Sequence, residues 1–161
     1  MAAPAAAQGK GALTMRVTDL IAQDHRRVRE LFVELERMDT DDGERRALLD
    51  RIVDELDVHA RAEEAVFYPA VRAASRRIDD AEAGHEYLRN AIAAFRALDV
   101  ECADFTLGVR LIKGIVLSHE LEEESGIFMD AQRLGGDELE RLGVAMQERK
   151  EALTKAQKRA A

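Results

Sequence analysis

Apolar residues recur every three or four positions along four long segments of the chain, and polar stretches separate these segments. That spacing places the apolar side chains on one face of an α-helix. We expect helices over about 18–38, 41–69, 80–98 and 104–129. Because short connections make consecutive helices antiparallel, the pattern predicts an all-α fold, an up-down-up-down four-helix bundle.

Several residues mark where these helices begin and end. Asp41, with Glu44 three positions later, matches the capping pattern of a helix start. Pro69 is expected to kink or end the second helix, because its ring removes a backbone donor. A loop is expected at 75–79, and Gly135 with its neighbouring glycine predicts a break after the fourth helix.

The pattern divides the chain into three parts. Residues 1–16 are rich in alanine and glycine and are expected to form a disordered leader. The bundle that carries the chemistry occupies 17–131. A short additional C-terminal helix and a basic tail occupy 136–161. We expect this helix to cover one end of the bundle, with a dimer contact as the alternative, so the protein is expected to be a monomer or a weak homodimer.

Composition narrows the function classes. The 161 residues carry a formal net charge of −8, and 47% of them are hydrophobic, enough for a folded core. An acidic chain lacks the basic field that nucleic acids and anionic membranes attract, so neither partner is expected. Arg26, Arg27 and Arg29 are interpreted as one solvated helix face.

The single cysteine and the length of the apolar runs bear on location. Cys102 cannot form an internal disulfide, which favours a reducing compartment, and we expect the cytoplasm. No apolar run reaches the roughly 18 residues of a transmembrane helix.

The four histidines of the chain repeat with two glutamates. Both halves contain two histidines 34 positions apart and a glutamate four positions after the second histidine, with the halves offset by 60 positions. The repeat consists of His25, His59 and Glu63 in the first half and His85, His119 and Glu123 in the second. Apolar positions also match across this offset, so we expect a structural duplication with a pseudo-twofold axis.

These six residues are expected to face one another inside the bundle. With a rise of 1.5 Å per residue, all four histidines fall at nearly one level, and each lies on the apolar stripe of its helix. A lone histidine on such a stripe is more often a core residue than a ligand. Two carboxylates and four imidazoles buried together, however, would need a compensating charge. A pair of divalent cations supplies that charge.

The donor set suits a limited group of metals. Imidazole and carboxylate without thiolate favour iron or manganese, with zinc possible. In the simplest assignment one ion takes His25 and His59, the other takes His85 and His119, and both glutamates bridge the ions. Six-coordination would leave room for an oxo or hydroxo bridge. The donor set therefore predicts two metal ions per chain and leaves iron and manganese open, with zinc less favoured.

The repeat resembles the hemerythrin-like, HHE cation-binding family over about 17–129. The matching residues are His25, His59 to Glu63 followed by Glu64, the aromatic-proline end Phe67–Tyr68–Pro69, His85, and His119 to Glu123. This resemblance implies a four-helix bundle with a non-haem di-iron centre that meets O2, H2O2 or NO. The symmetric arrangement is similar to actinobacterial-type members associated with peroxide or nitric oxide handling.

The chain departs from the oxygen-carrying members of that family. They have a fifth histidine four residues after the third, where this chain has Arg89, and their last carboxylate is often an aspartate five residues after the final histidine. The resemblance therefore implies an open metal position, unless Glu82 or Glu55 moves in. Open positions favour peroxide binding and turnover.

Decomposition of hydrogen peroxide is the leading functional prediction, with a sensor or store for oxygen, nitric oxide or iron as the alternative. A histidine phosphotransfer bundle would need one exposed histidine, which the inward-facing positions disfavour. Glu64 and Glu124 are interpreted as solvated or as partners of the ligands more than as ligands. Tyr68 could act near a reactive centre, and Tyr87 is expected to point elsewhere.

Overall fold

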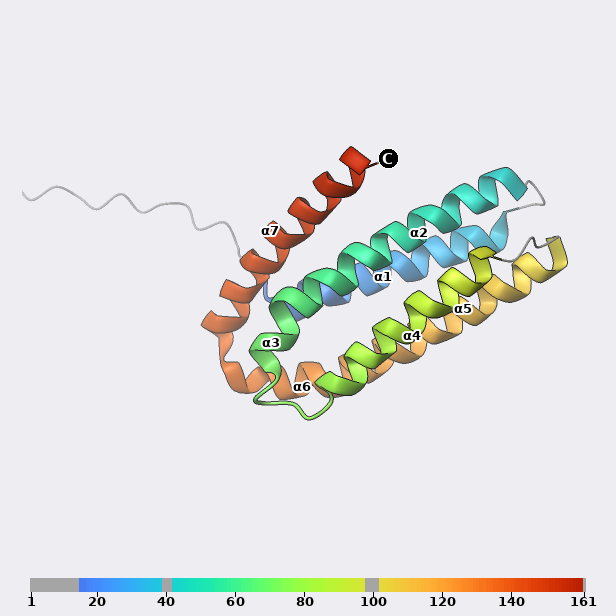
Figure 1. Ribbon diagram of the computed structural model, residues 1–161. Coiled ribbons are helices and arrows are strands. Elements are labelled where there is room, and N and C mark those ends of the chain that lie inside the picture. Colours follow the sequence, from blue (N-terminus) through green and yellow to red (C-terminus); the bar gives the residue numbers. More distant parts are fainter. Residues whose placement is uncertain (1–14, 39–41, 98–101, 161) are drawn as a thin grey trace, which may run out of the picture.

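The computed structural model describes residues 15–38, 42–97 and 102–160, which contain helices and no strand. Four long helical rods run side by side in alternating directions, as predicted (Figure 1). The helices are α1 (Val17–Arg37), α2 (Asp42–Ala62), η1 (Glu63–Phe67), α3 (Tyr68–Val71), α4 (Ile78–Ala97), α5 (Cys102–Glu122), η2 (Glu123–Ile127), α6 (Phe128–Ala131), η3 (Gln132–Leu134) and α7 (Gly136–Ala160).

The second and fourth rods each consist of three consecutive pieces. α2, the π-helix η1 and α3 form one rod, and α5, the π-helix η2 and α6 form the other. Each boundary in the second of these rods lies 60 positions after its counterpart in the first. The expected duplication is therefore confirmed at the level of secondary structure.

Pro69 does not end its helix at the proline. The helix continues through it to Val71, with Pro69 as the second residue of α3, directly after the π-helix η1. The π-helix before it is not a consequence of the proline, because η2 has the same bounds 60 positions later and has Met129 at the equivalent place. The loop predicted at 75–79 lies earlier, at 72–77, since α3 ends at Val71 and α4 already begins at Ile78.

Some sequence predictions fall on residues outside the described ranges. They are most of the leader predicted for 1–16, the Asp41 cap, and the turn around residue 100. Within the described ranges the first and third helices lie within about two residues of their predicted bounds, the usual uncertainty of helix ends.

Two apolar clusters lie at opposite ends of the bundle. The cluster near the ends of α2 and α5 that lead to the π-helices includes Ile21, Phe67 and Tyr68, and the cluster toward the other end includes Phe32, Ile52 and Ile112. The histidines on α1, α2, α4 and α5 lie between the two clusters along the chain. The apolar packing therefore encloses a polar layer in the middle of the bundle.

α7 packs against α1, α2 and η1. It begins after Gly135, whose φ of 84° lies in the left-handed region that glycine adopts without strain. Leu139, Leu142 and Met146 join the cluster at the α3 and α6 end, so α7 covers that end as predicted. With 25 residues it is longer than the short helix expected, and it continues along α1 and α2.

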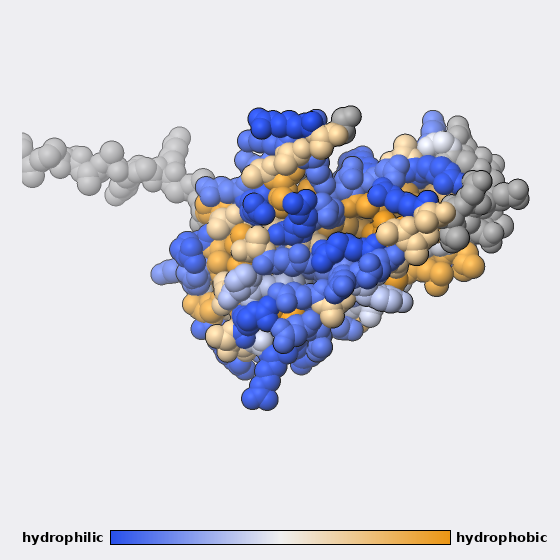
Figure 2. Space-filling model, viewed as in Figure 1, coloured by the Kyte–Doolittle hydropathy of each residue, from blue (hydrophilic) through white to orange (hydrophobic). Residues whose placement is uncertain are grey.

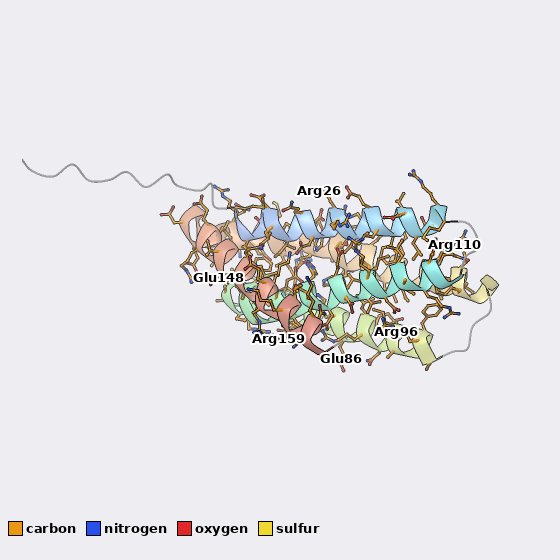
Figure 3. All side chains as sticks on the ribbon, turned by 90° about the horizontal axis from the view of Figure 1, so that it is seen from above. Arg26, Glu86, Arg96, Arg110, Glu148 and Arg159 are labelled. Carbon is orange, nitrogen blue, oxygen red and sulfur yellow. The ribbon has the colours of Figure 1, made fainter. Side chains whose placement is uncertain are left out.

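Charged side chains cover the outside of the bundle. Figure 3 labels six of them, all exposed: Arg26, Glu86, Arg96, Arg110, Glu148 and Arg159. The face seen in the orientation of Figure 1 is mainly hydrophilic, with hydrophobic side chains visible in between (Figure 2). None of the helices in the described ranges is long and apolar enough to span a lipid bilayer.

The close approach of α7 to the start of α1 gives a test of this packing. A Cβ atom at Gly143 would lie 2.0 Å from the backbone oxygen of Met15, so Gly143→Ala has to displace the helix. We expect the free energy of unfolding to fall by about 1–3 kcal/mol, measured by chemical denaturation. As the control, Gly114→Ala on α5 meets nothing within 4 Å and should stabilise the protein, because alanine has the higher helix propensity. Equal effects of the two substitutions would contradict the close approach.

Candidate metal centre

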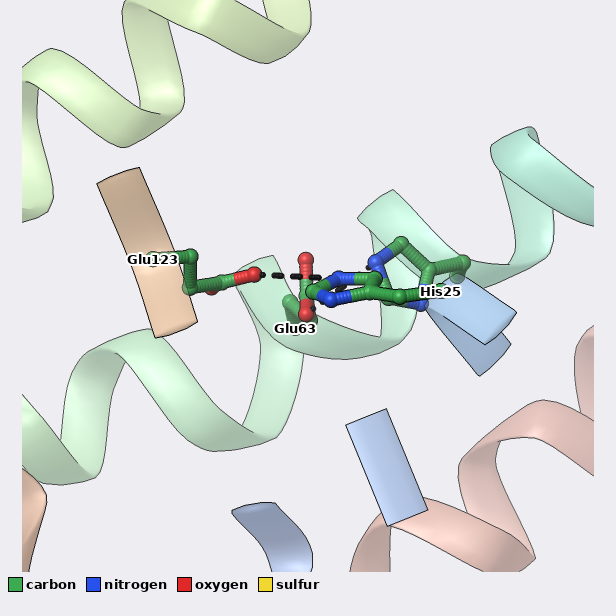
Figure 4. Close-up of side chains that lie close together, drawn as sticks. His25, Glu63 and Glu123 are labelled. Atoms are coloured by element: carbon green, nitrogen blue, oxygen red, sulfur yellow. Dashed lines mark ion pairs between the residues drawn. The ribbon is translucent and has the colours of Figure 1, made fainter. Parts of the chain in front are cut away.

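Six side chains from four helical rods meet in the polar layer between the two apolar clusters. They are His25 from α1, His59 from α2, Glu63 from η1, His85 from α4, His119 from α5 and Glu123 from η2. Five of the six are buried, and the two glutamates have no exposed surface at all. Figure 4 shows Glu123 and Glu63 approaching the ring of His25. All of the residues predicted to form the site therefore lie together.

Their ligand atoms form two overlapping groups. His25, His59, Glu63 and Glu123 offer four atoms that lie within 4.8 Å of one another. Glu63 also belongs to a second group with His85 and His119. The two carboxylate oxygens of Glu63 lie on different sides, with Oε1 3.2 Å from His59 Nε2 and Oε2 3.3 Å from His85 Nε2.

The predicted pairing of histidines agrees with these groups, but the two glutamates differ. Glu63 is shared, as expected for a bridging carboxylate. Glu123 belongs to the first group only, where its Oε2 lies 3.4 Å from His25 Nε2. Glu63 thus lies where a bridging carboxylate is predicted, whereas Glu123 lies closest to the histidine of α1, and bridging by both glutamates stays a prediction.

Buried atoms without hydrogen-bond partners indicate what the centre is built to hold. Within the described ranges, they include His25 Nε2, His119 Nε2, Glu63 Oε1 and both carboxylate oxygens of Glu123. Buried polar atoms are nearly always paired, because an unpaired one costs about 1–3 kcal/mol. All five are lone-pair donors of the types that iron accepts. The residues present therefore fit a pair of metal ions.

The electrostatics of the metal-free centre follow from burial. Burial, reinforced by the neighbouring carboxylate of Glu123, raises the pKa of Glu63 well above its usual range. Burial lowers the pKa of His85 to about 2, with further lowering by the other histidines. Burial also lowers the pKa of His59 and of His119. These three rings are thus neutral at pH 7, the form that binds metals.

His25 and Glu123 behave differently because they face each other. Burial opposes a charge on either group, but the attraction between the imidazole and the carboxylate, whose Nε2 and Oε2 lie 3.4 Å apart, prevails. It raises the pKa of His25 and lowers that of Glu123.

Each glutamate in the centre begins a π-helix. The backbone N–H of Tyr68 donates to the carbonyl of Glu63, and that of Phe128 donates to the carbonyl of Glu123, five positions back in both cases. π-helical turns are rare and frequent at functional sites. Periodicity could not reveal them, because the apolar stripe continues across the extra residue of each turn.

Three of the four histidines have a carboxylate at the ring nitrogen that faces away from the centre. Nδ1 of His25 lies 2.8 Å from Glu124 Oε1, and Nδ1 of His85 lies 3.0 Å from Glu64 Oε1. Nδ1 of His59 lies 3.2 Å from Asp24 Oδ2. Such partners hold the orientation and tautomer of a metal-binding ring. The interpretation of Glu64 and Glu124 as partners of the ligands is confirmed.

Arg89, which takes the place of the fifth histidine of the oxygen carriers, holds one of these partners. Two of its nitrogens donate to Glu64 Oε1, each at 3.0 Å. Arg29, 60 positions earlier, donates in the same way to Glu124 and also to the buried Glu120, at 2.7 Å. Arg26 and Arg27 are exposed, as interpreted, and Arg29 is 39% exposed at its side chain, but its head group also pairs with carboxylates of α5 and η2.

The two glutamates considered as replacement ligands are elsewhere. Glu82 pairs with Arg72, and Glu55 pairs with Arg51. Neither enters the groups of potential ligands. The surface arginines hold them because both side chains extend from the outer faces of their helices.

The tyrosines separate as expected. The ring of Tyr68 is fully buried and stacks on His85, and its hydroxyl lies 3.4 Å from Glu63 Oε2 and from His85 Nε2. Tyr87 is 63% exposed. The sequence analysis did not identify Asp24, Glu120 or Lys150. One signal was visible, because the position 60 residues after Asp24 is Gly84 and so breaks the repeat.

The chain is similar to a curated protein and to a solved structure over most of its length. A DNA nickase from Nostoc sp. is 32% identical over 126 residues, which make up 77% of this chain and 36% of that protein. The chain thus spans about a third of the length of this relative. The crystal structure of a hemerythrin HHE cation binding domain-containing protein from Mycobacterium kansasii has a TM-score of 0.81. It covers 88% of this chain and 89% of its own at 24% identity, which shows the common fold.

The family model of the hemerythrin HHE cation binding domain matches residues 16–131, which include all six residues of the centre. That range also contains both halves of the duplication and ends with α6. The chain therefore belongs to the hemerythrin HHE cation-binding domain family.

Proposed function

We propose that this protein holds two iron ions in the buried centre and uses them to decompose hydrogen peroxide to water and oxygen. The observation that carries the proposal is the shared carboxylate of Glu63, which faces a histidine of each half. Bound iron would supply the two-electron redox chemistry that turns two molecules of H2O2 into two of water and one of O2. No external reductant is needed for this balance.

The six residues would hold the ions in two subsites. We define the first subsite as His25, His59, Glu63 and Glu123, and the second as Glu63, His85 and His119. The second offers three groups and the first four, since Glu123 joins only the first by this geometry. Fewer protein ligands leave more positions for an exogenous molecule.

The space beside the histidines supports a small substrate. A cavity of about 20 Å³ is lined by all four histidines, with Asp24, Glu120 and apolar residues around it. This is room for a molecule near the size of water, for which about 10–15 Å³ suffices. H2O2, O2 and NO meet this limit, whereas an organic substrate does not.

Tyr68 supplies a proton donor at the second subsite. Burial, with the nearby charges of Glu63 and Glu123, raises the pKa of its hydroxyl, so the group keeps its proton at every physiological pH. The hydroxyl therefore donates toward Glu63 Oε2 or the His85 side of the cavity. On the other side of the pseudo-twofold axis the equivalent residue is Phe128, which stacks on His25 but has no hydroxyl.

The nicking activity named for the Nostoc relative is not carried over to this chain. The similarity covers only 36% of that protein, and a chain of net charge −8 does not favour binding to a phosphate backbone.

Iron content and oxygen release test the proposal together. Protein loaded anaerobically with Fe²⁺ should retain two ions per chain by elemental analysis and release O2 on an electrode when H2O2 is added. His119→Ala should retain about one ion and lose most of the oxygen release, because the second subsite loses a ligand. Tyr87→Phe, on an exposed side chain, should behave as wild type.

Two results would contradict the proposal. Wild-type protein without bound metal would refute the centre, and an iron-loaded protein that releases no oxygen would refute the turnover. Reversible O2 binding with no oxygen release from peroxide would favour the sensor or store instead.

Glu63→Gln should have opposite effects on stability and on metal binding. The raised pKa of Glu63 means that its ionisation is unfavourable in the folded metal-free protein. This destabilisation is present above the pKa of the unfolded chain, about 4.3, and vanishes as the pH falls below it. The substitution should therefore raise the melting temperature of metal-free protein at pH 7 by about 3 °C or more, with little gain at pH 3.5.

The same substitution should reduce retained iron, because an amide is a poorer bridging ligand than a carboxylate. Glu86→Gln removes one exposed charge from α4 and serves as the matched control, with unchanged iron content and melting temperature. A lower melting temperature for metal-free Glu63→Gln at pH 7 would show that the buried charge is not a cost.

A further inference from the structure

The outer partners of the histidines follow the duplication in two places and depart from it in a third. Arg29 with Glu124 and Arg89 with Glu64 are equivalent ion pairs, one on each side of the pseudo-twofold axis. They hold His25 and His85, which are equivalent rings. His59 and His119 are also equivalent, but their surroundings differ.

His59 has Asp24 at its outer nitrogen, whereas the position equivalent to Asp24 is Gly84. The backbone of α4 comes so close there that a Cβ at Gly84 would lie 3.1 Å from His119 Nδ1. No carboxylate can reach His119 from this position. The support of His59 is therefore an addition to one half only.

Asp24 is in turn held by a residue outside the duplicated region. Lys150 Nζ lies 2.6 Å from Asp24 Oδ2 and also contacts Asp24 Oδ1. Both side chains are 19% exposed, so the pair is largely shielded from water. Lys150 lies on α7, which is also outside residues 16–131 matched by the family model. An ion pair thus connects the added helix to the metal centre.

The packing around this pair is open. A cavity of about 580 Å³ lies between α7 and the bundle, and Asp24, His59 and Lys150 line it together with Thr154. Most of the buried apolar contacts of α7 lie nearer its start, at Leu139, Leu142 and Met146, and Leu153 follows after Lys150. The ion pair between Lys150 and Asp24 therefore connects α7 to the carboxylate that contacts His59.

We propose that α7 positions His59 through Lys150 and Asp24, so that docking of α7 and occupation of the first subsite favour each other. This inference rests on the metal binding of the proposed function and not on peroxide turnover. Loss of an outer partner commonly lowers metal affinity 10- to 100-fold. Because coupling between two sites is reciprocal, metal binding must strengthen the docking of α7 by the same factor.

The test uses Lys150→Met in the full-length protein, which keeps the length of the side chain and removes its charge. Lys155→Met makes the same change five residues later on α7, at an exposed position, and is the matched control. Co²⁺ is titrated into each protein against a competing chelator and followed by its visible absorption. We expect two ions in all three proteins, with one of the two affinities lowered 10- to 100-fold in Lys150→Met alone.

Hydrogen exchange provides a second readout that does not depend on the loaded centre's activity. Amides in the second half of α7 should gain protection when Co²⁺ binds to wild type and to Lys155→Met, and should gain little in Lys150→Met. Asp24→Asn, which keeps the shape of Asp24, should reproduce the effects of Lys150→Met if that variant folds poorly. The double variant should then be no worse than either single one.

Two outcomes would overturn the inference, and they are distinguishable. Two Co²⁺ sites of wild-type affinity in both Lys150→Met and Asp24→Asn would refute the positioning role and leave the metal centre intact. Wild-type protein that binds no Co²⁺ would refute the centre together with its positioning by α7.

Discussion

Two carboxylates and four imidazoles share the interior of this bundle with no lysine or arginine among them, and the rest of the site is arranged around that constraint. Glu63 and Glu123 are completely buried, and Glu63 Oε1 and both carboxylate oxygens of Glu123 have no hydrogen-bond partner in the described ranges. A buried charge of this kind is costly unless a cation compensates it. The apolar clusters on both sides keep water out, which strengthens the demand for a cation. Stability of the metal-free protein and affinity for metal therefore oppose each other at the same side chains.

Duplication explains most of the geometry, and its exceptions carry the functional differences. The helices, the π-turns at Glu63 and Glu123, and the arginine pairs at Glu64 and Glu124 all repeat after 60 positions. Tyr68 has no hydroxyl-bearing counterpart, and Asp24 is replaced by Gly84 in the other half. The group around His25 and His59 thus has an outer carboxylate, Asp24, that the equivalent ring His119 does not receive from Gly84, and the hydroxyl of Tyr68 lies beside His85. The two halves repeat the same frame with different surroundings.

Arg89 stands where the oxygen carriers have a fifth histidine, and its side chain contacts the carboxylate of Glu64 beside the centre. Arg89 is 46% exposed at its side chain, too far out to replace a ligand, yet it fixes the carboxylate that orients His85. The cavity of about 20 Å³ is lined by all four histidines and therefore lies beside both groups of potential ligands.

The sequence alone determined the helices, the bundle and the six residues that meet inside it. Helical periodicity and the spacing of histidines and glutamates are local properties, and the rise per residue converts them into depth along a rod. Which carboxylate holds which ring was decided by the tertiary structure. His25 and Glu124 lie 99 positions apart, and Lys150 and Asp24, which lie 126 positions apart, meet only when α7 packs on α1. The π-helical turns and the contact of Arg89 with Glu64 were likewise visible only in the tertiary structure. Contacts between rods depend on how side chains pack across them, and no periodicity within one rod contains that information.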